Sequence, residues 1–274
     1  YLMNDFYNLL DEKQVYFFPS SYKRSVAYGA EDAQGVVQRT AAMNAVKGFT
    51  KGYLIVCTYP EALAERVADA ETLRRDTIAV KVGDSISIAV LEDALVDANF
   101  TRVDFVYEPG QYSVRGGIVD VFSFSESKPY RIDFFGDEVD SIRRFNISSQ
   151  LSADKLDRVE IIPNLNAGDG AAKVSFVQFA GDAAAYWFYD ADYVLRRVND
   201  IRRKTLADME RPEEIDRLMT SRNALLGDLA NCRMLALRDN LPERPATAAV
   251  EFDTAPQPKF NKNFEMLADD MIRN

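Results

Sequence analysis

Residues 107–145, with the sequence YEPGQYSVRGGIVDVFSFSESKPYRIDFFGDEVDSIRRF, constrain the fold more than any other part of the chain. Residues 111–124 and 130–135 are rich in Val, Ile, Tyr and Phe, which favour β-strands. Gly136-Asp137 is a two-residue turn signal, and residues 138–145 return as a further strand. The pattern therefore predicts three strands in a row.

The segment RIDFF, residues 131–135, distributes its charges in an unusual way. Because side chains alternate across a strand, Arg131, Asp133 and Phe135 share one face. Ile132 and Phe134 share the other face, and a sheet with a single core face would bury these two. Phe135 then lies beside two charges on the wet face, which is more typical of a docking surface than of a core.

Gly116 and Gly117 interrupt the first of these predicted strands. Paired glycines inside a strand pattern mark a β-bulge or the close approach of another backbone. A phosphate-binding loop would need GxGxxG, or GxxxxGK followed by Ser or Thr, at the start of a helix, whereas these glycines lie among strand residues. We therefore predict a bulge and no phosphate site.

Charge and composition exclude several classes of function. The chain of 274 residues has a formal net charge of −10, so its general surface repels nucleic-acid phosphates. It contains no histidine, which removes His-dependent triads and His–metal ligation. Cys57 and Cys232 lie in separate apolar runs, which suits buried thiols in a reducing cytoplasm rather than a zinc site. No apolar run approaches ~20 residues, so we expect no membrane span. The chain begins at Tyr1 rather than Met, and we expect it to be a piece of a longer protein.

Outside the strand-rich stretch, strands alternate with helices, which implies a parallel sheet in an α/β layer. Changes in periodicity divide the chain into three segments: 1–80 begin an α/β domain, 81–165 form an inserted domain, and 166–274 return to the α/β domain. A polar linker over 164–170 marks the second boundary. The expected strands are 15–18, 53–57, 185–189, 232–237 and 248–252, and the expected helical segments are 1–11, 31–46, the segment that starts at Pro60, 193–231 and 260–273.

The motifs EPGQxxxRGGIxDVF and YRIDFFGDEVDSIRxF resemble the small inserted domain shared by the nucleotide-excision-repair helicase UvrB and the bacterial transcription-repair coupling factors. Outside this stretch, FFPSSYKRS, VCTYPEAL and PQPKFNKNFE are more similar to the coupling factors than to UvrB. The resemblance implies a degenerate RecA-like (P-loop-type) parallel-sheet domain, interrupted by a small strand-rich α+β domain.

The same resemblance implies a partner and the residues that contact it. In this family the inserted domain binds the damage-recognition ATPase UvrA, and the positions that matter fall on Arg115, Arg131 and Phe135. The two arginines would donate charge-assisted hydrogen bonds to carboxylates of UvrA, with Phe135 as an apolar contact between them. The alternative is that both arginines are ordinary solvated charges of a strand.

The α/β part lacks the motifs of an active motor. No Walker A loop occurs in the sequence, and where UvrB-like proteins carry Asp-Glu at the end of a strand this chain has Asp190-Ala191. We expect Asp190 to cap a helix rather than to bind magnesium. Residues 21–31 are too few for the Tyr-rich hairpin with which UvrB clamps DNA. No catalytic, cofactor-binding or metal-binding residue is therefore predicted, and ATP and Mg²⁺ would belong to the motor domain of the intact protein, an ATP-dependent DNA translocase.

These observations together predict a non-catalytic recruitment module, the N-terminal part of a cytoplasmic coupling factor. Its expected partners are UvrA and the C-terminal part of the intact protein, which the resemblance implies masks the same surface. RNA polymerase, DNA and nucleotide would be reached only through the rest of that protein, and no membrane is involved. Two alternatives remain open, which are a fragment of a UvrB-type ATPase or helicase and an intramolecular autoinhibitory clamp.

Overall fold

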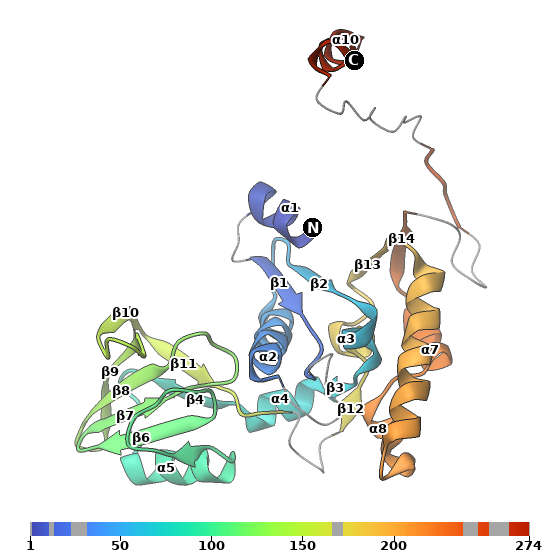
Figure 1. The fold of residues 1–274 in the computed structure, drawn as a ribbon. Helices are drawn as coiled ribbons and strands as arrows, with labels where there is room; N and C mark the ends of the chain where they lie inside the picture. Colours follow the sequence, from blue (N-terminus) through green and yellow to red (C-terminus); the bar gives the residue numbers. More distant parts are fainter. Residues whose placement is uncertain are drawn as a thin grey trace. The chain divides into compact units, whose positions relative to one another are not determined.

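The computed structural model describes residues 2–10, 14–22, 32–165, 172–237, 246–251 and 263–273. The chain divides into two units, Tyr1–Asp239 and Asn240–Asn274 (Figure 1). The first unit is a mixed α/β structure with several sheets, and the described part of the second contains helix α10 (Phe264–Arg273). None of the helices in the described ranges has the length and apolarity needed to cross a membrane.

The first unit begins with alternating helices and strands. Strands β1 (Val15–Phe18) and β2 (Ile55–Thr58) pair in parallel, and helix α2 (Ala33–Gly48), which connects them in the chain, packs against β1. Pro60 opens α3, where its missing N–H is not needed. The remaining elements of this part are α1 (Leu2–Leu9), α3 (Pro60–Ala64), β3 (Val67–Ala68) and α4 (Ala70–Asp76).

A buried arginine ties α2 to the strand ends. The guanidinium of Arg39 is almost fully buried and donates hydrogen bonds to the backbone oxygens of Pro19 (2.8 Å), Ala62 (3.2 Å) and Glu65 (3.1 Å). It also stacks on the ring of Phe18, 4.0 Å from its centroid. Because a buried charge is tolerated only with such partners, these contacts fix the end of β1 against α2 and α3.

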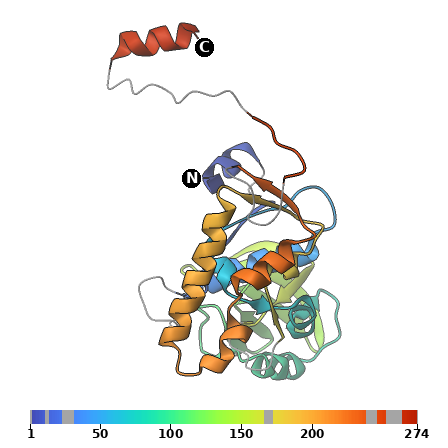
Figure 2. The same cartoon turned by 90° about the vertical axis from the view of Figure 1, so that its right-hand side faces the viewer.

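The α/β pattern resumes after residue 172. Strands β13 (Ala185–Phe188) and β14 (Arg233–Ala236) pair in parallel, with a helical region between them in the chain. That region begins with the long helix α7 (Ala191–Asp208), which packs against α3 and α9 and is drawn in orange tones with the helices that follow it (Figure 2). The other elements are β12 (Lys173–Val174), α6 (Phe176–Ala180), the 3-10 helix η2 (Pro212–Glu214), α8 (Ile215–Leu218) and α9 (Arg222–Leu229).

The expected alternation of strands and helices is confirmed, but the expected single parallel sheet is not seen among the described residues. In the α/β part, the described parallel strands form two separate two-stranded pairs, β1–β2 and β13–β14. Residues 248–251, where a further strand was predicted, are not in a strand. Residues 23–31, which include most of the interval compared with the UvrB hairpin, and most of the linker over 164–170 lie outside the described residues.

Between these two segments of the sequence, residues 101–156 form a six-stranded sheet in the order β10-β9-β8-β7-β6-β5, of which Figure 1 labels β6 to β10. Strands β5 and β6 are parallel, and every other neighbouring pair is antiparallel. The strands are β5 (Thr101–Arg102), β6 (Gln111–Arg115), β7 (Ile118–Val121), β8 (Tyr130–Phe135), β9 (Glu138–Phe145) and β10 (Ser152–Leu156). A separate antiparallel pair, β4 (Ile78–Lys81) with β11 (Arg158–Ile161), and helix α5 (Ile88–Asp97) complete this region.

One face of the six-stranded sheet forms a hydrophobic core. Alternate residues of the strands, such as Val119 and Ile132, pack with Leu91 and Leu95 of α5 and with Ile161 of β11. Every buried member of this cluster comes from residues 80–161. The cluster matches the strand-rich stretch expected from the sequence, whereas the domain boundaries at 81 and 165 remain predictions, since both lie inside the first unit.

Two glycine turns close the hairpins at the same end of this sheet. Gly136-Asp137 joins β8 to β9 as predicted, and Gly136 has a positive φ of 61°. Gly116-Gly117, predicted as a bulge, is instead a second two-residue turn that divides residues 111–124 into β6 and β7, so the row contains four strands where three were expected. The predicted close backbone approach does occur at Gly117, because its carbonyl accepts a 2.7 Å hydrogen bond from the N–H of Phe134.

Candidate docking surface

The second face of the sheet carries a row of polar residues that crosses neighbouring strands. Ser113 of β6 lies opposite Asp120 of β7, Asp120 lies opposite Arg131 of β8, and Arg131 lies opposite Arg143 of β9. Directly opposite residues of antiparallel strands bring their side chains within contact distance. The register therefore places Asp120 beside Arg131, although eleven positions of sequence separate them.

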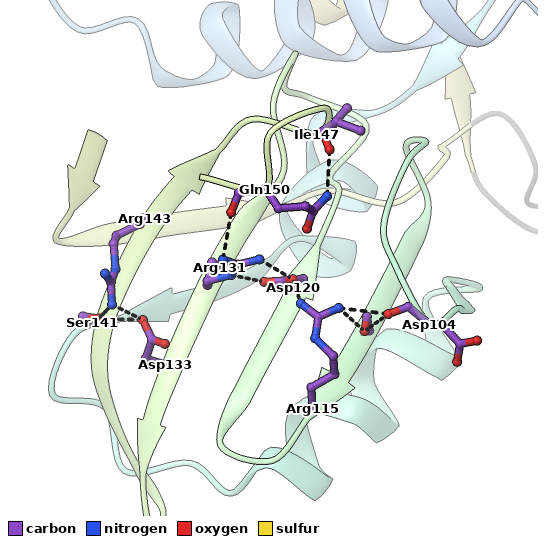
Figure 3. Close-up of polar contacts among 10 residues, drawn as sticks. Asp104, Arg115, Asp120, Arg131, Asp133, Ser141, Arg143, Ile147 and Gln150 are labelled. Atoms are coloured by element: carbon purple, nitrogen blue, oxygen red, sulfur yellow. Dashed lines mark hydrogen bonds and ion pairs between the residues drawn. The ribbon is translucent and has the colours of Figure 1, made fainter. Parts of the chain in front are cut away.

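Asp120 and Arg131 form a bidentate ion pair. The Nε and Nη2 atoms of Arg131 donate hydrogen bonds of 2.8 and 2.9 Å to the two carboxylate oxygens of Asp120 (Figure 3). The side chain of Asp120 is 1% exposed and that of Arg131 is 16% exposed. The hydrogen bonds to Asp120 raise the pKa of Arg131, which reinforces the charge of the guanidinium.

Arg115 reaches the same carboxylate from the end of β6. Its Nη2 donates to Oδ2 of Asp120, and its Nη1 donates to the backbone oxygen of Asp104 (2.9 Å) and to Ser113 Oγ (3.3 Å) (Figure 3). Its side chain is 36% exposed, more than twice the exposed fraction of Arg131. We call Arg115, Asp120 and Arg131 the arginine–aspartate cluster.

Each arginine of this cluster also stacks on an aromatic ring. The guanidinium carbon of Arg131 lies 4.5 Å from the ring centroid of Phe145, which is fully buried. That of Arg115 lies 5.1 Å from the ring centroid of Phe105, which is about half exposed. Phe145 belongs to a second, small hydrophobic cluster with Val106 and Phe122. Stacking on these aromatic rings thus restricts the orientation of the two guanidinium planes.

Phe135 lies at the end of β8, beside the turn that leads into β9. It is 83% exposed, the largest exposed fraction among the large hydrophobic residues described. Just before it the pairing of β8 with β9 shifts, because Asp133 lies opposite Ser141 whereas Phe134 lies opposite Val139. A large aromatic side chain left in water at a strand end has no role in packing, so it is free to contact another molecule.

The structure gives the three residues singled out from the sequence different surroundings. The expected faces are confirmed for Ile132, which is buried, and for Phe135, which is exposed. The expectation that Arg131 is a freely solvated charge is wrong, since most of its side chain is buried against Asp120 and Phe145. Phe135 is not the group that separates the two arginines, because Asp120 takes that place. The role of these three residues in docking remains a prediction.

Sequence reasoning missed two members of this surface, Asp120 and Phe105. Asp120 stands in the apolar run GIVDVF, and a charge in such a run is a usable signal, because a carboxylate among buried residues needs a partner. Phe105 lies in the loop before β6, and no local pattern links it to Arg115.

The α/β part places Asp190 at the N-cap of α7, as expected from the sequence. Its Oδ1 accepts a 2.8 Å hydrogen bond from the backbone N–H of Tyr193. Ala191, which stands where UvrB-like proteins carry the second acid, is buried. Among the described residues no group of three or more acidic or cysteine side chains is arranged to hold a metal ion.

Comparison with known proteins finds similarity over the part of the chain that carries this surface. The model of the UvrB interaction domain family matches residues 78–166, which contain the six-stranded sheet and the arginine–aspartate cluster. The transcription-repair-coupling factor of Bacillus subtilis (strain 168) is 30% identical over 161 residues, which are 58% of this chain and 13% of that protein. The corresponding factor of Escherichia coli (strain K12) is 31% identical over 128 residues, 47% of this chain and 11% of that protein.

The chain therefore spans about an eighth of the length of these relatives or slightly less. Residues 78–166 match the UvrB interaction domain family, and about half of the chain is similar to the transcription-repair-coupling factors.

Proposed function

We propose that this chain is a non-catalytic recruitment module that docks UvrA during transcription-coupled repair. The observation that carries the proposal is the polar face of the six-stranded sheet, where two arginines and an exposed phenylalanine lie within the matched domain. Aromatic and arginine side chains contribute most of the binding energy at protein interfaces. A partner that offers carboxylates and an apolar pocket would complement this face.

We call the polar face with Arg115, Arg131 and Phe135 the docking face. In this proposal the α/β part is a degenerate RecA-like domain that supports the docking face and binds no nucleotide. Two parallel strand pairs with intervening helices support a relation to that fold. The carboxylate of Asp190 is already engaged as a helix cap, which argues against its use as a magnesium ligand. A UvrB-type ATPase fragment is for that reason the weaker alternative. ATP, Mg²⁺, DNA and RNA polymerase would be handled by other parts of an intact, cytoplasmic protein.

An intramolecular clamp is a second role for the same face. The two arginines can donate hydrogen bonds to carboxylates of any acidic surface, and the C-terminal part of an intact coupling factor could supply such carboxylates. Such masking would be compatible with recruitment, because the face would become available to UvrA only when the clamp opens. We keep this role as a companion to docking.

Capture of purified UvrA by the immobilised 274-residue chain tests the proposal. We expect the wild-type chain to capture UvrA with or without nucleotide, and Phe135→Ala to lose most of the capture. Trp187→Ala provides a matched control, because Trp187 is also an exposed aromatic residue, 68% exposed, but lies on β13 outside the matched domain. Equal loss in both variants, or no capture by the wild type, would reject the proposal.

The clamp is tested by adding the C-terminal part of the intact protein as a competitor. We expect it to displace UvrA from the wild-type chain. Failure to compete would leave UvrA docking as the single role of this face.

A further inference from the structure

Within the described part of the chain, Asp120 is the one carboxylate that Arg115 and Arg131 share. We infer that Asp120 is the positioning residue of this face: it holds Arg115 and Arg131 side by side in the orientation in which they receive acidic groups of the partner. The inference rests on the proposed function and adds a residue that contacts the arginines rather than the partner.

The geometry fixes each guanidinium in two ways. Stacking on Phe105 or Phe145 sets the plane of the group, and the bond to Asp120 sets its rotation within that plane. Arginine side chains have many rotamers in solution, and ordering them during binding lowers affinity. Because Asp120 orders both groups beforehand, the partner meets donors that are already in position.

The arginines keep donors for a partner despite these bonds. A guanidinium has five N–H groups. The bonds of Arg115 to Asp104, Ser113 and Asp120 use three of them, and the bonds of Arg131 to Asp120 and Gln150 also use three. Two N–H groups of each arginine therefore have no partner within the described part of the chain. Positioning by Asp120 does not consume the recognition capacity of the pair.

Burial separates Asp120 from the partner itself. Its side chain is 1% exposed, so an approaching protein contacts the arginines and not this carboxylate. Asp120 also offsets the repulsion between two adjacent positive charges, so the cluster of two arginines and one aspartate carries a single net positive charge. Without Asp120 the two guanidinium groups would repel each other and turn away from their present orientation.

Positioning by Asp120 and simple charge complementarity predict opposite effects when the carboxylate of Asp120 is removed. Removal of a negative charge from a basic docking face should strengthen the capture of an acidic partner if only net charge mattered. If positioning matters, Asp120→Asn should weaken UvrA binding by roughly tenfold, because two side chains must then be ordered during binding. Asp133→Asn is the matched control for the effect of removing one negative charge. It removes the same charge from the same face but breaks a pair with Arg143, and should leave affinity equal or higher.

The experiment measures UvrA affinity for the 274-residue chain with Asp120→Asn, Asp133→Asn, Arg131→Ala and the double variant Asp120→Asn/Arg131→Ala. A residue that acts through Arg131 and Arg115 should show non-additive losses in this cycle, so Asp120→Asn should cost less in the Arg131→Ala chain than in the wild type. Side-chain NMR of the arginine Nε–H groups supplies a readout free of UvrA. The signal of Arg131 should be ordered in the wild type and averaged in Asp120→Asn.

The outcomes separate the two ideas. If the wild-type chain captures UvrA and Asp120→Asn captures it equally well or better, the positioning inference fails and the proposed function stands. Additive losses, or an Arg131 signal that stays ordered in Asp120→Asn, would also overturn the inference. If the wild type does not capture UvrA, the proposed function fails and the assignment of Asp120 to UvrA docking falls with it. Weakened capture of UvrA by Asp120→Asn supports the inference, provided that both variants are folded. Retained structure in Asp120→Asn and an unchanged urea midpoint for Asp133→Asn show that they are.

Discussion

Arg131 and Asp120 face each other across strands β8 and β7, and the guanidinium of Arg131 binds both oxygens of a carboxylate that is almost fully buried. This pair joins the docking face to the interior of the sheet. A substitution at Arg131 therefore affects stability and binding together, and the two effects must be measured separately.

Arg131→Ala should destabilise the chain by about 1–3 kcal/mol, because it leaves the buried carboxylate of Asp120 with Arg115 as its remaining ion-pair partner. The sequence alone predicted no such cost, since it placed Arg131 in solvent. Urea unfolding measures the free energy of unfolding. Arg115→Ala should cost less, because the Arg115 side chain is more exposed. A midpoint for Arg131→Ala equal to that of the wild type would contradict the ion pair.

The affinity for UvrA should depend on the charge and shape of the side chain at position 131. Arg131→Ala should weaken binding about thirtyfold, as expected for a residue that contributes strongly to an interface. Arg131→Lys keeps the charge, but a lysine cannot form the bidentate ion pair with Asp120 or stack as a planar group. This variant should therefore also bind UvrA more weakly than the wild type. Arg131→Glu should be the weakest, since it places like charges together. Surface binding kinetics with immobilised chain would give this order, and a lysine variant with wild-type affinity would show that charge alone suffices.

Local patterns were sufficient for several of the strands and helices. The apolar run at Val15–Phe18 predicts β1 without error, and Gly136-Asp137 predicts its hairpin, because both signals lie within a few residues. The hairpin at Gly116-Gly117 was mistaken for a bulge, although Gly-Gly is itself a turn signal. The alternation of core residues also changes phase there, from Tyr112 and Val114 to Val119 and Val121.

The docking face could be predicted only in part, because its geometry depends on strand register. The sequence pattern identifies Phe135 as exposed and Ile132 as buried from the period of two alone. It cannot show that Asp120 lies opposite Arg131, since that contact follows from the pairing of β7 with β8. The separation of β1–β2 from β13–β14 is likewise a matter of tertiary packing, which no local pattern encodes.

Asp190→Ala should lower the free energy of unfolding by about 1 kcal/mol, the usual effect of removing a helix N-cap. It should not alter nucleotide binding, because we expect the wild-type chain to bind none. Calorimetric titration with ATP and Mg²⁺, run on both chains, tests this. Micromolar binding by the wild type that disappears in Asp190→Ala would show that the carboxylate is a functional metal ligand.

Asp69 caps α4, the helix that precedes the matched domain, and should make stability depend on pH. Its Oδ1 accepts a 2.7 Å hydrogen bond from the N–H of Thr72, and this bond is the main cause of its lowered pKa. Because the folded pKa lies below the unfolded value of about 3.9, the cap stabilises the fold above that value and is lost as the pH falls through the folded pKa.

Asp69→Ala should therefore cost about 1 kcal/mol at neutral pH. Asp69→Asn retains an oxygen acceptor but cannot ionise, so its deficit relative to the wild type should shrink as the pH is lowered below the unfolded pKa. Thermal unfolding of the three chains over an acidic pH series would measure this convergence. Parallel curves for the wild type and Asp69→Asn would show that ionisation of Asp69 does not contribute.

Phe135 and Ile132 offer the sharpest separation of binding from folding on this face, because they belong to the same strand and differ in burial. Phe135→Ala should leave stability within about 0.5 kcal/mol of the wild type, since the side chain is 83% exposed. It should weaken UvrA binding about thirtyfold, as loss of an aromatic interface residue does. Ile132→Ala should behave in the opposite way and destabilise the chain by about 2–5 kcal/mol, because it empties part of the core between the sheet and α5. At a temperature where the Ile132→Ala chain remains folded, its affinity for UvrA should equal that of the wild type. A binding defect in Ile132→Ala as large as that in Phe135→Ala would show that the face responds to the stability of the sheet rather than to the exposed ring.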